Sequence, residues 1–419
     1  MHHELIDTVP RNPLSSRSFF RDPVGYVAAR GADPAAVRLA AGTREFIVLR
    51  KPEAVWRVLV TDAGAFRQGK WKQRAGRFLG ETLNTLDGAQ HRERRSIVQP
   101  AVDRRRIAMF APSVLARADA MQDRWRDGSR FRLREELDRL SLVVAGDVLL
   151  STDLEPEASE LAEALSKVMA AVPRLRGPFS GTGQAQALAR VDQSIAEIIE
   201  RRRGESNPGD DLVGVLLRSK FPERIVRGEV TAFLLAAVDE PPSGLAAAWY
   251  LLGQDEAAES RFHEEIDSSL VDASAMLDAS LQPPYLSAVI REALRLFPPA
   301  RHIDRCPVES TRVDGVNLGG GSNVVVSPLV IHRDARLFDR PSEFVPERWL
   351  QGSGASPPQR GAYLPFGAGP HTCIGEPLAS LIMTLTLASV GGRWRLRLDP
   401  DPPEPVPRAS ALFVTLEAR

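Results

Sequence analysis

The chain has 419 residues, and its 54 Lys and Arg residues balance its 54 Asp and Glu residues. This balance excludes the global basic field that nucleic-acid binding usually needs. Hydrophobic residues make up 43% and charged residues 26%, which excludes a disordered chain. The two cysteines, Cys306 and Cys373, are too few for a disulfide scaffold and indicate a reducing, cytoplasmic location. No run of about 18 apolar residues occurs, so we expect no membrane anchor.

Helical patterns, with apolar residues at three- and four-residue spacing, dominate the chain. In chain order the clearest predicted helices are Val114–Trp125, Arg134–Leu150, Leu161–Ala171, Gln184–Arg203, Tyr285–Phe297 and Pro377–Val390. Strand patterns are fewer and cover Glu45–Leu49, Arg312–Val316, Asn323–Ser327 and Ala411–Glu417. Predicted loops are Val172–Gly183, Arg203–Asp211 and Gln351–Arg360. We therefore expect a mainly α protein with a small β component, as a flexible segment 1–17 followed by a single domain over 18–419.

The segment 366–375 reads FGAGPHTCIG and precedes the helix predicted from Pro377. Its glycines permit tight turns and close approach to a flat partner, and they let backbone N–H groups point at one sulfur. A helix that begins just after Cys373 favours its thiolate. Taken alone, a glycine-rich loop with one cysteine is more often an ordinary structural feature.

This segment resembles the haem-binding signature of the cytochrome P450 superfamily, Phe-x-x-Gly-x-(Arg or His)-x-Cys-x-Gly, which ends here at Gly375. The resemblance implies that Cys373 ligates the iron of haem b (iron protoporphyrin IX). It further implies that Phe366 packs beside the sulfur and that His371 reaches a haem propionate. The implied fold is the single-domain cytochrome P450 fold, a helical bundle around the haem with small sheets.

The helix predicted over Tyr285–Phe297 carries Glu292 and Arg295 at a spacing where opposite charges meet on one face. Such a pair is usually a surface salt bridge. Here it resembles the Glu-x-x-Arg helix of the same family, and the segment FVPERW at 344–349 resembles the one that supplies Arg348. The resemblance implies a buried, structural ionic triad.

Further motifs imply contacts with the haem propionates. The segment HRERR at 91–95 resembles the His-x-x-x-Arg helix of the family, which implies that His91 and Arg95 lie near these groups. Arg305 resembles the further propionate-binding arginine, and Arg301 is a close competitor.

The sequence departs from the family pattern at residues 234–243, which read LLAAVDEPPS where an acid followed by threonine is usual. Asp239 aligns with the acid and Glu240 with the alcohol. A shift of one position makes Glu240 the acid and places Pro241 at the alcohol. The threonine is absent in both alignments, and Asp239 and Glu240 are the candidate catalytic residues.

Pro241 and Pro242 cannot donate to the carbonyls of Ala237 and Val238, so we expect the helix to kink or open there. The freed carbonyls would then hold ordered water over the haem. Alternatively the helix breaks at this point, and both carboxylates face solvent.

The family resemblance implies a haem-thiolate monooxygenase that oxidises a small organic substrate in specialised metabolism. Without the threonine, Glu240 can serve as the acid if burial raises its pKa, or a substrate hydroxyl can replace the alcohol. The alternatives are coupling, rearrangement or peroxide-driven chemistry, and a haem- or ligand-binding protein without activity.

The resemblance also implies an external ferredoxin or flavodoxin with its reductase as electron donor. Arg92, Arg94 and the run 104–106 form a candidate docking face, and a merely solvated basic face fits them equally well.

Overall fold

The computed structural model of the chain describes residues 19, 21–29, 35–41, 44–171, 182–206, 208–268, 283–352, 357–398 and 412–419. The expected N-terminal segment 1–17 and most of the predicted loop Val172–Gly183 lie outside these residues.

Helices form most of the described chain and include all six that were predicted, with boundaries shifted by up to three residues. They are α2 (Pro23–Ala28), α3 (Pro52–Trp56), α4 (Lys70–Leu79), α5 (Gly88–Val98), α6 (Arg104–Ala108), α7 (Ala111–Gln122), α8 (Leu133–Ala145), α9 (Ala158–Ala171), α10 (Thr182–Arg203), α11 (Leu212–Arg218), α12 (Glu223–Leu252), α13 (Glu256–Ser268), α14 (Pro284–Leu296), α15 (Pro328–Ile331) and α16 (Glu376–Arg393). The predicted helix Arg134–Leu150 is α8 followed by a π-helical turn, Gly146–Leu150. The expectation of a mainly α protein with a small β component is confirmed.

The strands form three small sheets. Their bounds are β1 (Ala36–Ala41), β2 (Arg44–Leu49), β3 (Phe66–Gln68), β4 (Arg130–Arg132), β5 (Ile303–Pro307), β6 (Thr311–Val313), β7 (Val316–Leu318), β8 (Asn323–Val326), β9 (Trp394–Leu398) and β10 (Phe413–Ala418). The largest sheet has the order β1-β2-β8-β5-β3, with β2 and β8 parallel and the other pairs antiparallel. The other two sheets are β4-β10-β9 and β6-β7.

One strand prediction is wrong. Arg312–Val316 is not a single strand: it covers the end of β6, a two-residue turn and the first residue of β7. Asp314 and Gly315 both have positive φ, 45° and 87°. A two-residue loop with this backbone reverses the chain with the twist that a hairpin requires, and Asp-Gly is a favoured sequence for it.

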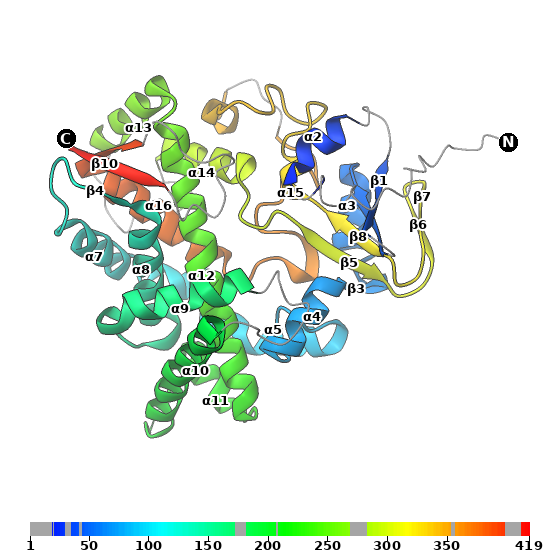
Figure 1. Cartoon of the computed structure of the whole chain (residues 1–419), viewed down its shortest axis with the longest axis horizontal. Helices are drawn as coiled ribbons and strands as arrows, with labels where there is room; N and C mark the ends of the chain where they lie inside the picture. Colours follow the sequence, from blue (N-terminus) through cyan, green and yellow to red (C-terminus); the bar gives the residue numbers. More distant parts are fainter. Residues whose placement is uncertain are drawn as a thin grey trace.

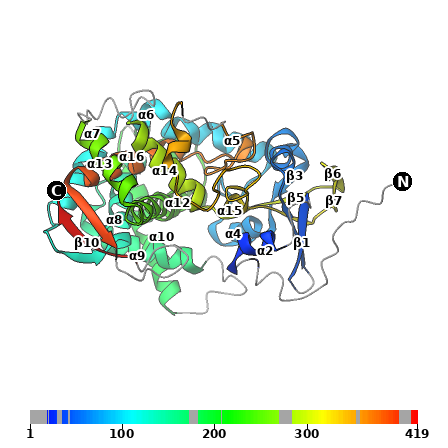
Figure 2. The same ribbon diagram turned by 90° about the horizontal axis from the view of Figure 1, so that it is seen from above.

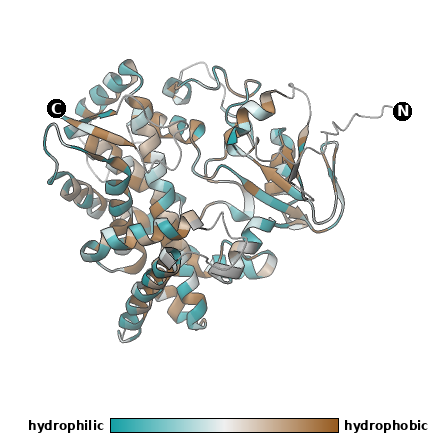
Figure 3. Cartoon of the chain, in the orientation of Figure 1, coloured by the Kyte–Doolittle hydropathy of each residue, from teal (hydrophilic) through white to brown (hydrophobic). Residues whose placement is uncertain are grey.

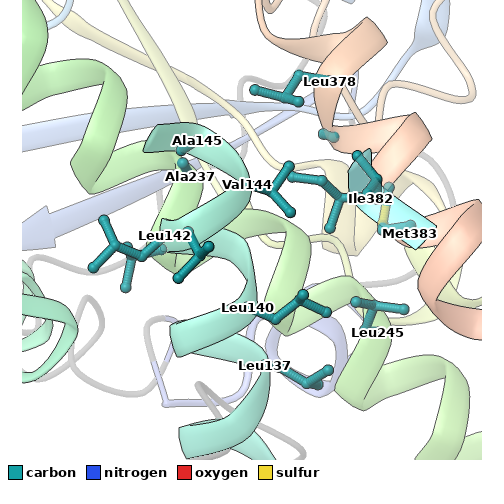
Figure 4. Packing of buried hydrophobic residues seen from close by; sticks show 14 of the residues in the cluster. Leu137, Leu140, Leu142, Val144, Ala145, Ala237, Leu245, Leu378, Ile382 and Met383 are labelled. Atoms are coloured by element: carbon teal, nitrogen blue, oxygen red, sulfur yellow. The ribbon is translucent and has the colours of Figure 1, made fainter. Parts of the chain in front are cut away.

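The five-stranded sheet lies at one end of the molecule together with α2, α3 and α15. Most of the longer helices lie at the other end, and α12 runs through them (Figure 1). The view from above shows the same separation, with β1 and β3 at one end and α7, α8 and α13 at the other (Figure 2). Hydrophobic segments follow the helices and the strands of the large sheet (Figure 3). The main apolar core joins α8, α12 and α16, where Leu137, Leu140, Leu245 and Met383 are buried and pack together (Figure 4). Burial of this apolar area is the main force that fixes α12 between its neighbours.

Candidate functional site

The loop before α16 folds back tightly around Cys373. Gly367 and Gly369 have φ values of 71° and 75°, which favour glycine. A Cβ at Gly369 would lie 1.9 Å from the carbonyl oxygen of Leu59, so this position also requires glycine for close packing. The backbone N–H of Cys373 donates to the carbonyl of Phe366 at 2.9 Å. These contacts fix the thiol at the N-terminal end of α16.

The Cys373 side chain is exposed, yet much of the protein surrounds it. Burial, followed by the nearby Glu240 carboxylate, raises the pKa of the free thiol to about 11, while the Gly375 N–H lowers it. Both observations fit a sulfur that solvent reaches inside the protein rather than on its outer surface. Only a strong positive charge, such as a metal ion, would hold this thiol as thiolate at neutral pH.

The predicted propionate residues converge from three segments. His91 and Arg95 come from α5, Arg305 from β5 and His371 from the cysteine loop. The rings of His91 and His371 lie 3.9 Å apart between centroids. Arg95 Nη1 donates to the carbonyl of Thr372 at 2.8 Å, which attaches α5 to the cysteine loop.

The electrostatics of this cluster favour a bound anion. Burial, then the Arg95 charge, lowers the pKa of His91 to about 4. Burial, then His91 and Arg305, lowers the pKa of His371 to about 3. Cations gathered at one place disfavour one another's charge, and a pair of carboxylates would relieve this repulsion. The two propionates of a haem would therefore fit this cluster.

Gln68, the last residue of β3, connects this cluster and was not identified from the sequence. Its Oε1 accepts from Arg305 Nη1 at 3.0 Å, and its Nε2 lies 2.9 Å from His371 Nδ1. Because a guanidinium only donates, Oε1 faces Arg305, and Nε2 therefore donates to Nδ1. The neutral His371 ring then carries its proton on Nε2, 3.6 Å from Asp87 Oδ1. The backbone N–H of Gln68 also donates to Asp87, at 2.9 Å from Oδ1.

Glu292 lies at the centre of the predicted triad and is fully buried. Arg295 donates to both of its oxygens at 2.8 Å, and Arg348 Nε donates to Oε1 at 3.0 Å. The structure adds two donors, Trp349 Nε1 at 2.8 Å and the Val345 N–H at 3.0 Å. The triad thus ties α14 to the segment 345–349, and the aromatic donor was not anticipated from the sequence.

The central helix differs from expectation. α12 continues through Pro241 and Pro242 without interruption, so the expected opening and the alternative of a break are both wrong, whereas the expected kink stays a prediction. The carbonyls of Ala237 and Val238, expected to hold water, accept hydrogen bonds from side chains of α8. Tertiary contacts therefore overcome the local effect of the two prolines.

The two candidate catalytic carboxylates face different surroundings. Asp239 Oδ1 lies 3.3 Å from Arg134 Nη2 on α8. Glu240 acts electrostatically on Cys373 and on Lys72 of α4, so it lies on the side of the cysteine loop. Burial and the Arg305 charge lower the pKa of Lys72, and Glu240 partly opposes this shift. Of the two carboxylates, Glu240 is the one whose charge raises the pKa of the Cys373 thiol.

Two properties of the described ranges bear on the class of site. No group of three His, Cys, Asp or Glu side chains there is suited to hold a metal ion. No helix within the described ranges is long and apolar enough to cross a membrane.

Comparison with known proteins gives a consistent result. The family model "Cytochrome P450" matches residues 34–419. Cyclooctatin synthase of Streptomyces melanosporofaciens is 34% identical over 92% of this chain and 88% of its own length. From the same organism, cyclooctat-9-en-7-ol 5-monooxygenase is 30% identical over 91% of this chain and 86% of its own. Pentalenene oxygenase of Streptomyces avermitilis is 27% identical over 91% of this chain and 88% of its own.

Solved structures share the fold. Retinoic-acid-bound cyanobacterial CYP120A1 superposes with a TM-score of 0.81, at 22% identity and 92% coverage of both chains. The haem domain of cytochrome P450DA gives a TM-score of 0.82, at 20% identity, and covers 97% of this chain and 94% of its own.

Proposed function

The chain belongs to the cytochrome P450 family, and we propose that it inserts one oxygen atom into a small cyclic hydrocarbon or its alcohol. It is an oxidoreductase that binds iron protoporphyrin IX haem, and its relatives are monooxygenases. The observation that supports the proposal is the glycine-rich loop that holds Cys373 just before α16, where the charge of Glu240 also acts on the sulfur.

In this proposal Cys373 ligates the iron, and His91, Arg95, Arg305 and His371 hold the propionates. Gly375 supports the sulfur through its N–H, and we assign Phe366, partly buried against the core, to packing beside it. When bound, a thiolate-ligated haem supplies the activation of dioxygen, since electron donation from the sulfur favours O–O cleavage. The protein's own contribution on the other side is Glu240, which we assign to proton delivery.

The names of the relatives support an apolar, unsaturated substrate. Two of them act, by name, on cyclooctat-9-en-7-ol and on pentalenene. Such molecules offer few polar groups, so recognition would depend mostly on apolar contacts. We infer a role in secondary metabolism, as for these relatives.

Electrons would come from an external ferredoxin or flavodoxin with its reductase. Arg94 is not available for docking a donor, because it is buried and pairs with Glu229 on α12. Arg92, in the middle of α5, and Arg104 and Arg105, at the start of α6, are exposed. An acidic donor would be attracted by these three charges. The low cysteine content supports a cytoplasmic location for this system.

A second candidate function is peroxide-driven or coupling chemistry, because no threonine follows the acid. A third is a haem- or ligand-binding protein without turnover. Both of these candidate functions are suggested by residues 239–242 of α12, where the usual threonine is absent.

Spectra and turnover with two oxidant systems separate these functions. The reduced holoprotein with carbon monoxide is expected to show the red-shifted Soret band of the family, which Cys373→Ala should abolish and the control Cys306→Ala should retain. Pentalenene and related cyclic alkenes are then offered with labelled dioxygen, ferredoxin, its reductase and NADPH. Labelled alcohol supports monooxygenation, product with peroxide alone supports the second candidate, and a binding spectrum without product supports the third.

A further inference from the structure

The two prolines of α12 remove two specific hydrogen bonds. In an α-helix the N–H of residue i donates to the carbonyl of residue i−4. Pro241 and Pro242 therefore leave the carbonyls of Ala237 and Val238 without helical donors. All four residues are buried, so leaving those carbonyls unpaired would destabilise the fold.

Side chains of α8 donate to these same two carbonyls. Ser141 Oγ donates to the Ala237 carbonyl at 2.6 Å. Arg134 Nη2 donates to the Val238 carbonyl at 3.0 Å. The two donors are seven positions apart, two helical turns, so they lie on one face of α8. The apolar residues Leu137 and Leu140 lie between them in sequence and pack toward α12 (Figure 4).

The remaining donors of Arg134 bind the next turn of α12. Nη1 donates to Ser243 Oγ at 2.7 Å, and Ser243 Oγ donates to the Asp239 carbonyl at 2.6 Å. Nη2 also lies 3.3 Å from Asp239 Oδ1, and Nε pairs with Asp138 one turn along α8. Arg134 is 7% exposed. A buried guanidinium with this many partners fixes the positions of all of them.

We propose that Arg134 is a positioning residue for the oxygen-activating side of the haem. It replaces the hydrogen bond that Pro242 removes, and it holds the Asp239 carboxylate against α8. Consecutive side chains on a helix are about 100° apart, so with Asp239 fixed toward α8, Glu240 is presented toward Cys373. The inference rests on the proposed function only in calling this side oxygen-activating.

A double-mutant cycle tests the hydrogen-bond replacement. Arg134→Met keeps the length of the side chain and removes its donors, and Pro242→Ala restores the backbone N–H. We expect Arg134→Met to lower the apparent Tm of the holoprotein by about 5 °C. In the Arg134→Met/Pro242→Ala variant the part of that loss due to the Val238 carbonyl should be recovered, because the substitution of Pro242 supplies the missing N–H. If the effects of the two substitutions simply add, the proposal is overturned.

A milder cycle covers the case in which Arg134→Met does not fold. Ser141→Ala and Pro241→Ala form the equivalent pair at the Ala237 carbonyl, and the same recovery is expected. The matched control is Arg139→Met on α8, which removes a guanidinium that pairs with Glu155 and not with α12. Its effect on Tm should not depend on Pro242→Ala.

A spectroscopic titration separates positioning from stability alone. Imidazole binding to the ferric holoprotein reports on the space above the iron and needs no turnover. We expect Arg134→Met to tighten imidazole binding at least threefold. The segment around Asp239, once it is released from Arg134, would obstruct the imidazole less. This change should persist in Arg134→Met/Pro242→Ala, in which the fold is restored and Asp239 is still free of Arg134. Unchanged imidazole affinity would overturn positioning, whereas absent product formation in the wild type would instead overturn the monooxygenase function.

Discussion

The imidazole rings of His91 and His371 face each other with centroids 3.9 Å apart and planes inclined by 42°. One ring comes from α5 and the other from the cysteine loop, so the stacked pair joins the two segments that would enclose the propionate side of the haem. The Gln68 side chain hydrogen-bonds to both Nδ1 of His371 and the guanidinium of Arg305, and so it holds both groups in place. A residue that contacts no haem atom in our assignment thereby orients two that do.

Substitution of Gln68 by leucine is expected to speed haem loss. Leucine keeps the approximate volume but leaves Arg305 and His371 without their shared partner, at about 1–3 kcal/mol for each unpaired group. Transfer of haem to an excess of apomyoglobin should be roughly tenfold faster. Gln193→Leu, on the exposed face of α10, is the control and should match wild type. Equal transfer rates for Gln68→Leu and wild type would show that Gln68 does not orient the propionate residues.

Replacement of Glu292 by glutamine is expected to prevent accumulation of haem-loaded protein. The amide would turn N–H groups toward Arg295, Arg348 or Trp349, and the buried Arg295 would lose its counter-charge. Breaking a buried pair in this way costs about 3–5 kcal/mol. The measurements are the haem-to-protein ratio after purification and the apparent Tm. Glu347→Gln, which affects an exposed pair with Arg261, should change neither; a stable, haem-loaded Glu292→Gln protein would contradict the buried triad.

The two carboxylates of α12 should respond differently to neutralisation. Glu240→Gln is expected to lower kcat about 100-fold and to increase the share of reducing equivalents released as peroxide, because a proton donor is lost. Asp239→Asn should mainly lower the apparent Tm, because it weakens the contact with Arg134. Rates of product formation, NADPH consumption and peroxide release measured together distinguish the two. The reverse pattern would make Asp239 the proton donor.

The buried His332 ring is expected to make the free energy of unfolding fall at acidic pH. Its Nε2 accepts from the Leu364 N–H at 2.8 Å, so the ring is neutral with its proton on Nδ1, 3.2 Å from the Arg295 carbonyl. Burial, opposed by that carbonyl and reinforced by the Arg295 charge, lowers the pKa of His332 to about 3. The unfolded chain takes up a proton near pH 6.5 and the folded chain does not, so stability is present above pH 6.5 and is lost as pH falls toward 3.

The loss assigned to His332 is about 2 kcal/mol between roughly pH 7 and pH 5. Urea unfolding of wild type and His332→Gln at both values measures it. The variant should be less stable at neutral pH, and its stability should fall less on acidification. Parallel pH dependences would show that another group titrates in this range.

Local patterns in the sequence predicted the main helices, because helical periodicity depends on neighbours a few positions away. The cysteine loop and the charged triad came instead from the family resemblance, since Arg348 and Glu292 are 56 positions apart. The chain-distant contacts were missed. Gln68 and Arg305 are 237 positions apart, and nothing in the composition around Gln68 indicates that β3 pairs with β5. The Asp-Gly turn at 314–315 carried a hairpin signal, which the apolar pattern of Arg312–Val316 obscured.

The double proline shows why a correct local rule gave a wrong expectation. Proline does remove the helical donors, and the rule that the helix then opens holds for an isolated helix. The compensating donors lie on α8. Arg134 precedes Val238 by 104 positions, and Ser141 precedes Ala237 by 96. Their presence follows from the packing of two helices, which no window of the sequence contains.

The turn of α12 that contains the two prolines consequently cannot satisfy all of its backbone carbonyls from within the helix during folding. Helix propagation normally adds one backbone hydrogen bond for each residue, but residues 241 and 242 add none until Arg134 and Ser141 arrive. The middle of α12 should therefore become protected only when α8 docks, and the order of events would be association first and local helix second. The haem would then bind to a segment of α12 that becomes helical only after α8 has docked.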